Sequence, residues 1–337
     1  MNVKRIVSMT DLIFHIGFSK CASTTLQKKV FLTDPGYIGV YHSDIKGRID
    51  YAKQFQNFSP LGVKINGNIR QAKKWKHTVL AYKKSHAPHV NRLIASSEFF
   101  TQNNKLRNRP ITKFLKRFND DIWDEGNVKV VVVIRNQAEK IASGYAQDSN
   151  TTPHASQADF VRYTNRYLKK HGHLMDYSAW VEELQEAFGK GNLQVLLMED
   201  IGNIDFWLKI KSFCDLQELK PESMLNNEGE NVKKMGKYRW AIQPFNSAFK
   251  AKVIANNILK LVWPHHIKQD LRESTRLTFI KLITNYYQSR FYGSNSVKRE
   301  DQIVLTESLQ EQIKEHYRSS NLRLSELLDR DLTKLGY

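Results

Sequence analysis

Short hydrophobic runs alternate with helical patterns over the first two thirds of the chain, and the runs predict four buried strands. The runs cover residues 12–16, 92–96, 127–134 and 192–198. The third run, NVKVVVVI, is dominated by β-branched residues, which is typical of a central parallel strand buried on both faces. Helical spacing is expected at residues 66–86, 108–120, 137–147, 156–171 and 178–188. This alternation predicts an α/β fold with a P-loop-like parallel sheet flanked by helices.

The pattern changes near residue 204, after which we expect helices alone, with aromatic and basic residues interleaved. No internal repeat and no low-complexity linker interrupts the sequence. We therefore expect a single domain over residues 1–337, with an α/β core at 1–203 and a mainly helical C-terminal annex at 204–337.

The first predicted strand leads directly into a candidate anion-binding loop within DLIFHIGFSKCASTTLQKK. Gly17 lets the chain turn sharply out of the strand, and Lys20 places a positive charge inside the loop. The loop then supplies small and hydroxyl-bearing residues, namely Cys21, Ala22, Ser23, Thr24 and Thr25. Because a helix is expected to start near Thr24, its N-terminal N–H groups and those of the loop would converge on a phosphate.

This loop departs from the Walker pattern G-x-x-x-x-G-K-[ST] of nucleoside triphosphatases. Counted from Gly17, the second glycine position is Ala22 and the lysine position is Ser23. The lysine lies three residues earlier, at Lys20. The sequence thus indicates a phosphate-binding loop, but one that is a poor match to the loops that bind nucleoside triphosphates.

The loop resembles the 5′-phosphosulfate loop of sulfotransferases that use 3′-phosphoadenosine-5′-phosphosulfate (PAPS), whose core is K-x-G-[ST]-[ST]; Lys20 to Thr24 match it except at Ala22. A second stretch, VVVVIRNQAEKIASGYAQ, resembles the 3′-phosphate signature of the same family, a buried strand ending in arginine with a serine eight residues later. Arg135 and Ser143 have this spacing, and Asn136 can cap the helix between them. An arginine there can bind a phosphate through two parallel hydrogen bonds.

The resemblance implies transfer of the sulfuryl group of PAPS to a hydroxyl, with release of adenosine 3′,5′-bisphosphate (PAP) and without a metal. Lys20 would stabilise the departing 5′-phosphate. Glu98 stands where related cytosolic enzymes carry a catalytic histidine, and would be the base. Many glycan sulfotransferases instead use a glutamate shortly after the first helix, where this chain offers His42 and Asp44 as alternatives.

Three further elements are similar to the family. Lys234 and Gly236, within KKMGK, resemble the basic glycine loop that closes over the 3′-phosphate, although a solvated charge run is nearly as good an interpretation. Glu199 and Asp200 follow a hydrophobic strand, and we interpret them as structural. The ending SNLRLSELLDRDLTKLGY resembles that of bacterial carbohydrate sulfotransferases.

The net charge of the chain indicates the class of acceptor. The 52 lysines and arginines exceed the 34 aspartates and glutamates by 18, which favours a polyanionic partner. With the resemblance, this predicts a carbohydrate acceptor, in particular an acidic polysaccharide or glycan. Peripheral membrane contact through the basic helices stays open, and the sequence does not give the oligomeric state.

The cysteines and the hydropathy of the sequence indicate the cellular location of the protein. The two cysteines, Cys21 and Cys214, support neither a disulfide framework nor a zinc site. No signal peptide or long apolar run is apparent, so we expect a cytoplasmic protein without a transmembrane segment.

Two other classes of function remain as alternatives. A nucleotide kinase or NTPase would need Mg²⁺ and an aspartate ending a hydrophobic strand, but VVVVI ends in Arg135. A nucleic-acid-binding protein would explain the charge, yet no recognisable nucleic-acid motif is present.

Overall fold

The structure is a computed structural model of the 337-residue chain. It describes residues 9–44, 49–51, 54, 65–98, 110–225, 234–236, 238–246, 278, 281–283, 285–286 and 299–337.

A four-stranded parallel sheet forms the centre of the α/β core, in the order β2-β1-β3-β4. The strands are β1 (Asp11–Gly17), β2 (Arg92–Ser97), β3 (Val128–Ile134) and β4 (Leu193–Leu197). Each lies within two residues of a predicted run, and the predicted α/β fold with a parallel sheet is confirmed. β1 and β3 are central strands that are buried on both faces of the sheet, which is why their sequences are almost continuously hydrophobic.

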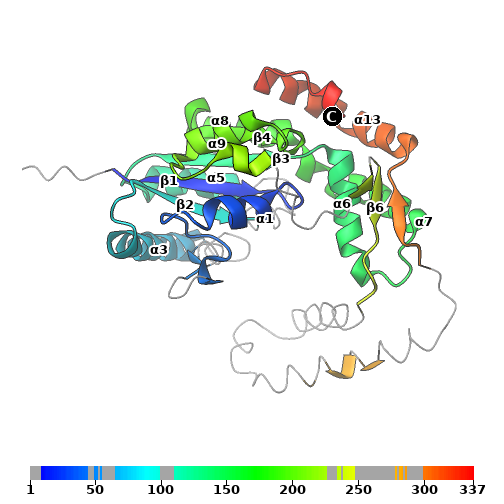
Figure 1. Ribbon diagram of the computed structural model, residues 1–337, viewed down its shortest axis with the longest axis horizontal. Helices are drawn as coiled ribbons and strands as arrows, with labels where there is room; N and C mark the ends of the chain where they lie inside the picture. The colour runs from blue at the N-terminus through cyan, green and yellow to red at the C-terminus, as the bar shows by residue number, and fades with distance from the viewer. Residues whose placement is uncertain are drawn as a thin grey trace, which may run out of the picture. The chain divides into compact units, whose positions relative to one another are not determined.

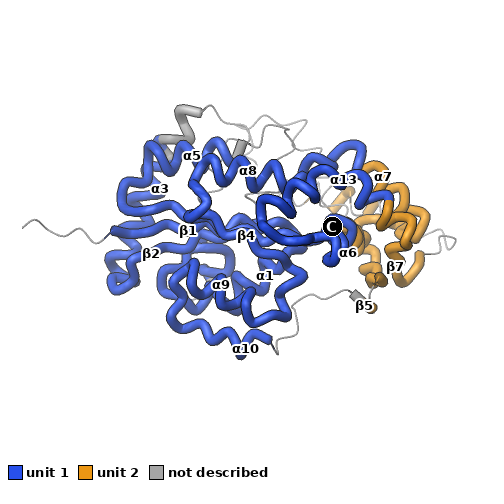
Figure 2. The backbone as a smooth tube through the Cα atoms, turned by 90° about the horizontal axis from the view of Figure 1, so that it is seen from above, with its two compact units in different colours: residues 1–140, 168–232, 312–337 blue, residues 141–167, 233–311 orange. Residues whose placement is uncertain are grey.

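Helices cover both faces of this sheet (Figure 2). The chain forms the helices α1 (Ser23–Thr25), which continues into the π-helical η1 (Leu26–Phe31), α3 (Ile65–His86), α5 (Pro110–Asp121), α6 (Gln137–Asp148), α7 (Gln157–His171), α8 (Tyr177–Phe188), α9 (Ile204–Cys214), α10 (Pro221–Leu225) and α13 (Glu307–Leu328). In Figure 2, α3, α5 and α8 lie on one side of the sheet, and α1, α9 and α10 on the other.

The two faces follow from the alternation of side chains along β1. Phe14 points toward α5, where its ring meets Phe118 edge-on at 5.8 Å between centroids. His15 points to the opposite face and meets Phe31 of η1 at 5.5 Å. Both residues are fully buried, so the strand has no solvent-facing side.

The chain divides into two compact units, coloured differently in Figure 2. Unit 1 comprises residues 1–140, 168–232 and 312–337 and contains the parallel sheet. Unit 2 comprises residues 141–167 and 233–311. These boundaries cut across the expected division at residue 203, because the last helix of the chain mostly belongs to unit 1 and the α6–α7 segment to unit 2.

Unit 2 holds a small antiparallel sheet of β5 (Lys234–Gly236), β6 (Arg239–Ala241) and β7 (Gln302–Val304). The expectation of helices alone after residue 204 is therefore wrong for these segments. Trp240 and Ile303 are buried and pair across the sheet, while Arg239 is exposed. Strands of three residues contain too few alternations to be recognised as a pattern of period two.

Among the helices that the structure describes, none is long and apolar enough to cross a membrane.

Candidate active site

Strands β1, β2 and β3 are parallel neighbours, so their carboxyl ends lie at the same end of the sheet (Figure 1). Gly17, Glu98 and Arg135 stand at these three strand ends. From β1 the chain continues through α1 toward β2, whereas from β3 it continues toward β4 on the other side. This divergence is a topological switch point, where open α/β sheets bind their ligands. The register places Gly17 beside Val133, and Ile16 beside Ser97, so the three strand ends are level.

The loop after β1 has the backbone of an anion-binding nest. Lys20 and Ala22 have positive φ angles of 68° and 57°, and Cys21 between them does not. Alternation of this kind turns successive N–H groups toward one side, where they can surround an anion. The helical run Ser23–Phe31 follows at once, and its first N–H groups have no partner within the helix. The loop therefore suits a phosphate or sulfate group.

Gly17 permits the close approach on which the loop depends. A Cβ atom on Gly17 would lie 2.5 Å from Ser23 Oγ and 3.3 Å from Glu98 Cγ. Ser23 is buried, and its hydroxyl donates to the carbonyl oxygen of Phe18 at 3.2 Å, which closes the loop. Gly17, Ser23 and Glu98 thus meet at the ends of β1 and β2.

The remaining loop residues divide between core and solvent. Cys21 and Thr25 point into the protein, while Ala22 and Thr24 stay half-buried. Burial raises the pKa of the Cys21 thiol to about 12. Cys21 is consequently a neutral packing residue whose backbone, not its sulfur, serves the loop.

Arg135 joins the second motif to the first. Its guanidinium donates from Nη1 to the carbonyl oxygen of Lys20 at 3.4 Å. Nη2 donates to Glu139 Oε2 at 2.7 Å, an ion pair along α6. Arg135 is 9% exposed, so this cation is fixed at the rim of the loop by the protein around it.

A network from distant segments holds the backbone beside Arg135. Asn136 caps α6 as expected, since its Oδ1 accepts from the N–H groups of Ala138 and Glu139 at 2.9 and 3.1 Å. Glu199 accepts from Asn136 N at 2.7 Å and from the Tyr337 hydroxyl at 3.0 Å. The structural interpretation of Glu199 is confirmed by these two bonds.

Glu98 has the electrostatic setting of a general base. Burial raises the pKa of its carboxyl above the usual value, and the Lys20 ammonium and the nearby Ser23 hydroxyl oppose that rise. A carboxylate with a raised pKa is a stronger proton acceptor than an exposed one. Lys20 therefore lies near enough for its charge to act on the Glu98 carboxyl, and the catalytic roles of the two residues stay predictions.

Sequence reasoning missed Lys140, in the first turn of α6. Its ammonium lies over the ring of Phe18, 5.4 Å from the centroid. Burial lowers its pKa, and interaction with Cys21 opposes that effect. The only sequence signal was a lysine five residues after Arg135, which by itself does not distinguish the site from a helix surface.

The two alternative bases have different positions. His42 is fully buried among Tyr37, Tyr51 and Tyr82, with Nδ1 at the carbonyl oxygen of Ile49 and Nε2 3.2 Å from the Tyr82 hydroxyl. Both ring nitrogens are engaged, so His42 acts as a core residue. Asp44 ends the short helix η2 (His42–Asp44), and its side chain lies outside the described residues.

Three predicted residues lie in unit 2. Ser143 is half-buried on α6, past the boundary between the units. Lys234 and Gly236 form β5, and the side chain of Lys234 is outside the described part. Their predicted contact with a 3′-phosphate stays a prediction.

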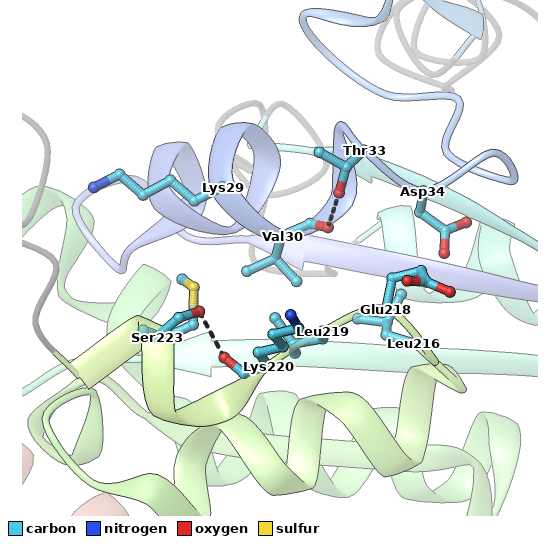
Figure 3. Close-up of a pocket in the computed structure, with 10 residues that line it drawn as sticks. Lys29, Val30, Thr33, Asp34, Leu216, Glu218, Leu219, Lys220 and Ser223 are labelled. Atoms are coloured by element: carbon cyan, nitrogen blue, oxygen red, sulfur yellow. Dashed lines mark hydrogen bonds between the residues drawn. The ribbon is translucent and has the colours of Figure 1, made fainter.

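No group of three or more His, Cys, Asp or Glu side chains that could hold a metal ion occurs among the described residues. A cavity of about 160 Å³ lies elsewhere, between η1 and the segment before α10, where Val30 and Leu219 contribute to its walls (Figure 3). A groove of about 530 Å³ runs along β4, the last strand of the described sheet. Neither is lined by Lys20, Glu98 or Arg135.

No family model matches the chain, and no curated protein matches it by sequence. Among solved structures, the crystal structure of a sulfotransferase from Alicyclobacillus acidocaldarius is similar over 96% of this chain and 97% of that chain, at 14% identity and a TM-score of 0.43. Both values are low, so the function proposed below is derived from the residues of this chain.

Proposed function

We propose that the protein is a sulfotransferase that moves the sulfuryl group of PAPS to a hydroxyl of a carbohydrate acceptor and releases PAP. The observation that carries this proposal is the contact between Arg135 Nη1 and the Lys20 carbonyl. It unites two motifs, each resembling one half of a PAPS site, at the switch point of the sheet. A nucleotide with phosphates on both its 5′ and 3′ positions is the ligand class that two such cationic sites suit.

Each half of the site has a distinct task. The loop from Lys20 to Thr25 would surround the 5′-phosphosulfate with N–H groups and hydroxyls. Arg135 would bind the 3′-phosphate through its planar fork. Because the Glu139 carboxylate already pairs with Nη2, the phosphate would share the guanidinium with it or replace it.

Lys20 and Glu98 would carry out the transfer step. Glu98 would take the proton of the acceptor hydroxyl as its oxygen attacks sulfur, and the bond from sulfur to the bridging 5′-phosphate oxygen breaks. Lys20 would neutralise the charge that develops on that oxygen. The acceptor gains the sulfuryl group, and the proton remains on Glu98 until solvent removes it.

Charge supports an acidic carbohydrate as the acceptor. The formal net charge of +18 attracts polyanions and raises the rate of encounter with them. A nucleic acid would be attracted by the same charge, but a nucleic-acid-binding protein has no need of a phosphate loop beside a fixed arginine. A cytoplasmic location and peripheral membrane contact are further proposals.

A nucleotide kinase or NTPase is the second candidate, since the loop binds phosphate in either case. Its chemistry requires a carboxylate that positions Mg²⁺ at a strand end near the loop. At the end of β3 the chain places Arg135, a cation that repels a metal ion. This position favours metal-independent chemistry.

Isothermal titration calorimetry with PAP, and with ATP in the presence and absence of Mg²⁺, tests the proposal. We expect metal-independent binding of PAP, and a loss of about 100-fold in Arg135→Ala because hydrogen bonds to a charged ligand are removed. Arg117→Ala is the matched control, since Arg117 pairs with Asp121 on the exposed surface of α5. Preference for Mg-ATP, or equal losses in both variants, would overturn the proposal.

Turnover is the second readout. Incubation with PAPS and a panel of acidic, neutral and sulfated polysaccharides should release PAP only with an acceptor present. Release with nucleic acid alone would contradict the carbohydrate assignment.

A further inference from the structure

Lys140 has an unusual position for a lysine. It lies in the first turn of α6, where its N–H group donates to the carbonyl oxygen of Asn136 at 2.9 Å. The N-terminal turn of a helix carries a partial positive charge, so a cation is disfavoured there. The side chain is also partly buried, which adds a desolvation cost.

Within the described part of the chain, nothing compensates the charge of this ammonium through an ion pair or hydrogen bond. The ammonium lies over the face of the Phe18 ring, 5.4 Å from its centroid, which is a weak cation–π interaction. The adjacent carboxylate, that of Glu139, is held by Arg135 at 2.7 Å. A partly buried lysine without an anionic partner is costly unless a ligand supplies the anion.

The neighbours of Lys140 show where that anion would be. Phe18 is the first residue of the loop after β1. Cys21 lies near enough to Lys140 for the ammonium charge to lower the pKa of its thiol. Both belong to the half of the site that surrounds the 5′ group. Arg135, on the preceding turn, faces the Lys20 carbonyl instead.

We propose that Lys140 is a second cation of the anion site, and that its ammonium binds the 5′-phosphate end of the nucleotide. This inference rests on the proposed function for the identity of the nucleotide, but its geometry depends only on the loop. Lys20 belongs to the loop itself and Lys140 to helix α6. A doubly charged phosphate bound between the two ammonium groups would be neutralised by both lysines.

Ligands that carry one phosphate each separate the two halves of the site. Calorimetry would compare PAP, adenosine 5′-monophosphate and adenosine 3′-monophosphate on wild type, Lys140→Met and Lys140→Arg. We expect Lys140→Met to weaken the two ligands with a 5′-phosphate by about tenfold or more, and the 3′-monophosphate by less than about twofold. Lys140→Arg should restore part of the loss, because it keeps the charge.

Two readouts exclude a merely structural role. Ligand-free Lys140→Met should unfold at the same or a higher temperature than wild type, because methionine fills the space without an uncompensated charge. Binding of the 5′-monophosphate to wild type should weaken as pH rises through the lowered pKa of Lys140, and Lys140→Arg should abolish that dependence. Lys116→Met, on the exposed face of α5, is the control for the loss of one charge.

Equal weakening of all three ligands, a lowered melting temperature with no selective loss, or unchanged binding would overturn the role of Lys140. Failure of the proposed function looks different, since wild type would then bind Mg-ATP in preference to PAP. In that case Lys140→Met should still weaken ATP, which carries its phosphates on the 5′ position, and unchanged ATP binding would overturn the inference. A wild type that binds no nucleotide would overturn both.

Discussion

The guanidinium of Arg135, just past the end of β3, donates to the main-chain carbonyl of Lys20, in the loop after β1. The two residues are 115 positions apart in sequence and follow neighbouring strands of the sheet. Their contact aligns a cation with a loop of outward-facing N–H groups, so that one ligand can reach both. The loop and Arg135 are each held in position by different neighbouring residues, which can be substituted separately.

Ala22→Gly tests the strain in the loop. Ala22 has φ 57° and ψ 12°, a left-handed conformation that a residue with a Cβ adopts at a cost. Glycine removes that cost but gains entropy in the unfolded chain, so we expect a net stabilisation of about 0.5 to 1 kcal/mol by chemical denaturation. Ala138→Gly, in the first turn of α6, should instead destabilise the protein by about 1 kcal/mol. Destabilisation by both would show that Ala22 is not strained.

Gly17→Ala tests the close approach at the strand end. Its new Cβ would lie 2.5 Å from Ser23 Oγ, so the loop must shift, with an expected loss of about 1–3 kcal/mol in the free energy of unfolding and weaker PAP binding. Ser23→Ala removes the oxygen but leaves Ser23 Cβ, 3.1 Å away. The double variant should therefore recover part of the loss. Strict additivity in this double-mutant cycle would contradict the contact.

Glu98→Gln should separate catalysis from binding. We expect turnover to fall by about 10²- to 10⁴-fold while PAP binding persists, since the amide cannot accept the proton. In wild type, kcat/KM should decline as pH falls through the raised pKa of Glu98. Glu186→Gln, on the exposed part of α8, serves as the control. Retention of full activity would place the base elsewhere.

The same variant carries a stability prediction. Burial raises the pKa of Glu98 in the folded state, so the folded protein binds this proton more tightly than the unfolded chain. Its contribution to stability is therefore complete at low pH and is lost as pH rises through the folded pKa. Above that pKa, Glu98→Gln should melt at a higher temperature than wild type by calorimetry. A lower melting temperature would mean that the ionised carboxylate stabilises the fold.

Tyr337→Phe tests the network behind Arg135. Loss of the hydroxyl leaves the half-buried Glu199 Oε2 without its 3.0 Å donor, and we expect a destabilisation of about 1–2 kcal/mol. PAP affinity should fall less than in Arg135→Ala, because the substitution leaves the Arg135 guanidinium in place and acts on it through Glu199. Arg330→Ala breaks a more exposed ion pair with Asp200 and should cost less than about 1 kcal/mol. Equal effects of the two substitutions would argue against a special role for Tyr337.

The strands and helices of the parallel core were predictable because each is encoded by a local pattern. The run ending at Ile134 is hydrophobic at nearly every position, as a strand covered on both faces requires. The loop and Arg135 were recognisable for a similar reason, since each needs particular residues at fixed short spacings. The strands of unit 2 were missed because three residues contain too little pattern.

Sequence alone determined that this chain has an α/β core, a loop of small and hydroxyl-bearing residues after its first strand and an arginine after its third. Only the tertiary structure decided that the two strands are neighbours, that Glu98 meets Gly17 and Ser23, and that Lys140 lies over Phe18. Tyr337 and Glu199 likewise are 138 residues apart and meet only when the chain is folded. Local patterns fix backbone conformation and burial, but contacts between distant side chains depend on how the elements pack, which no short stretch of sequence contains.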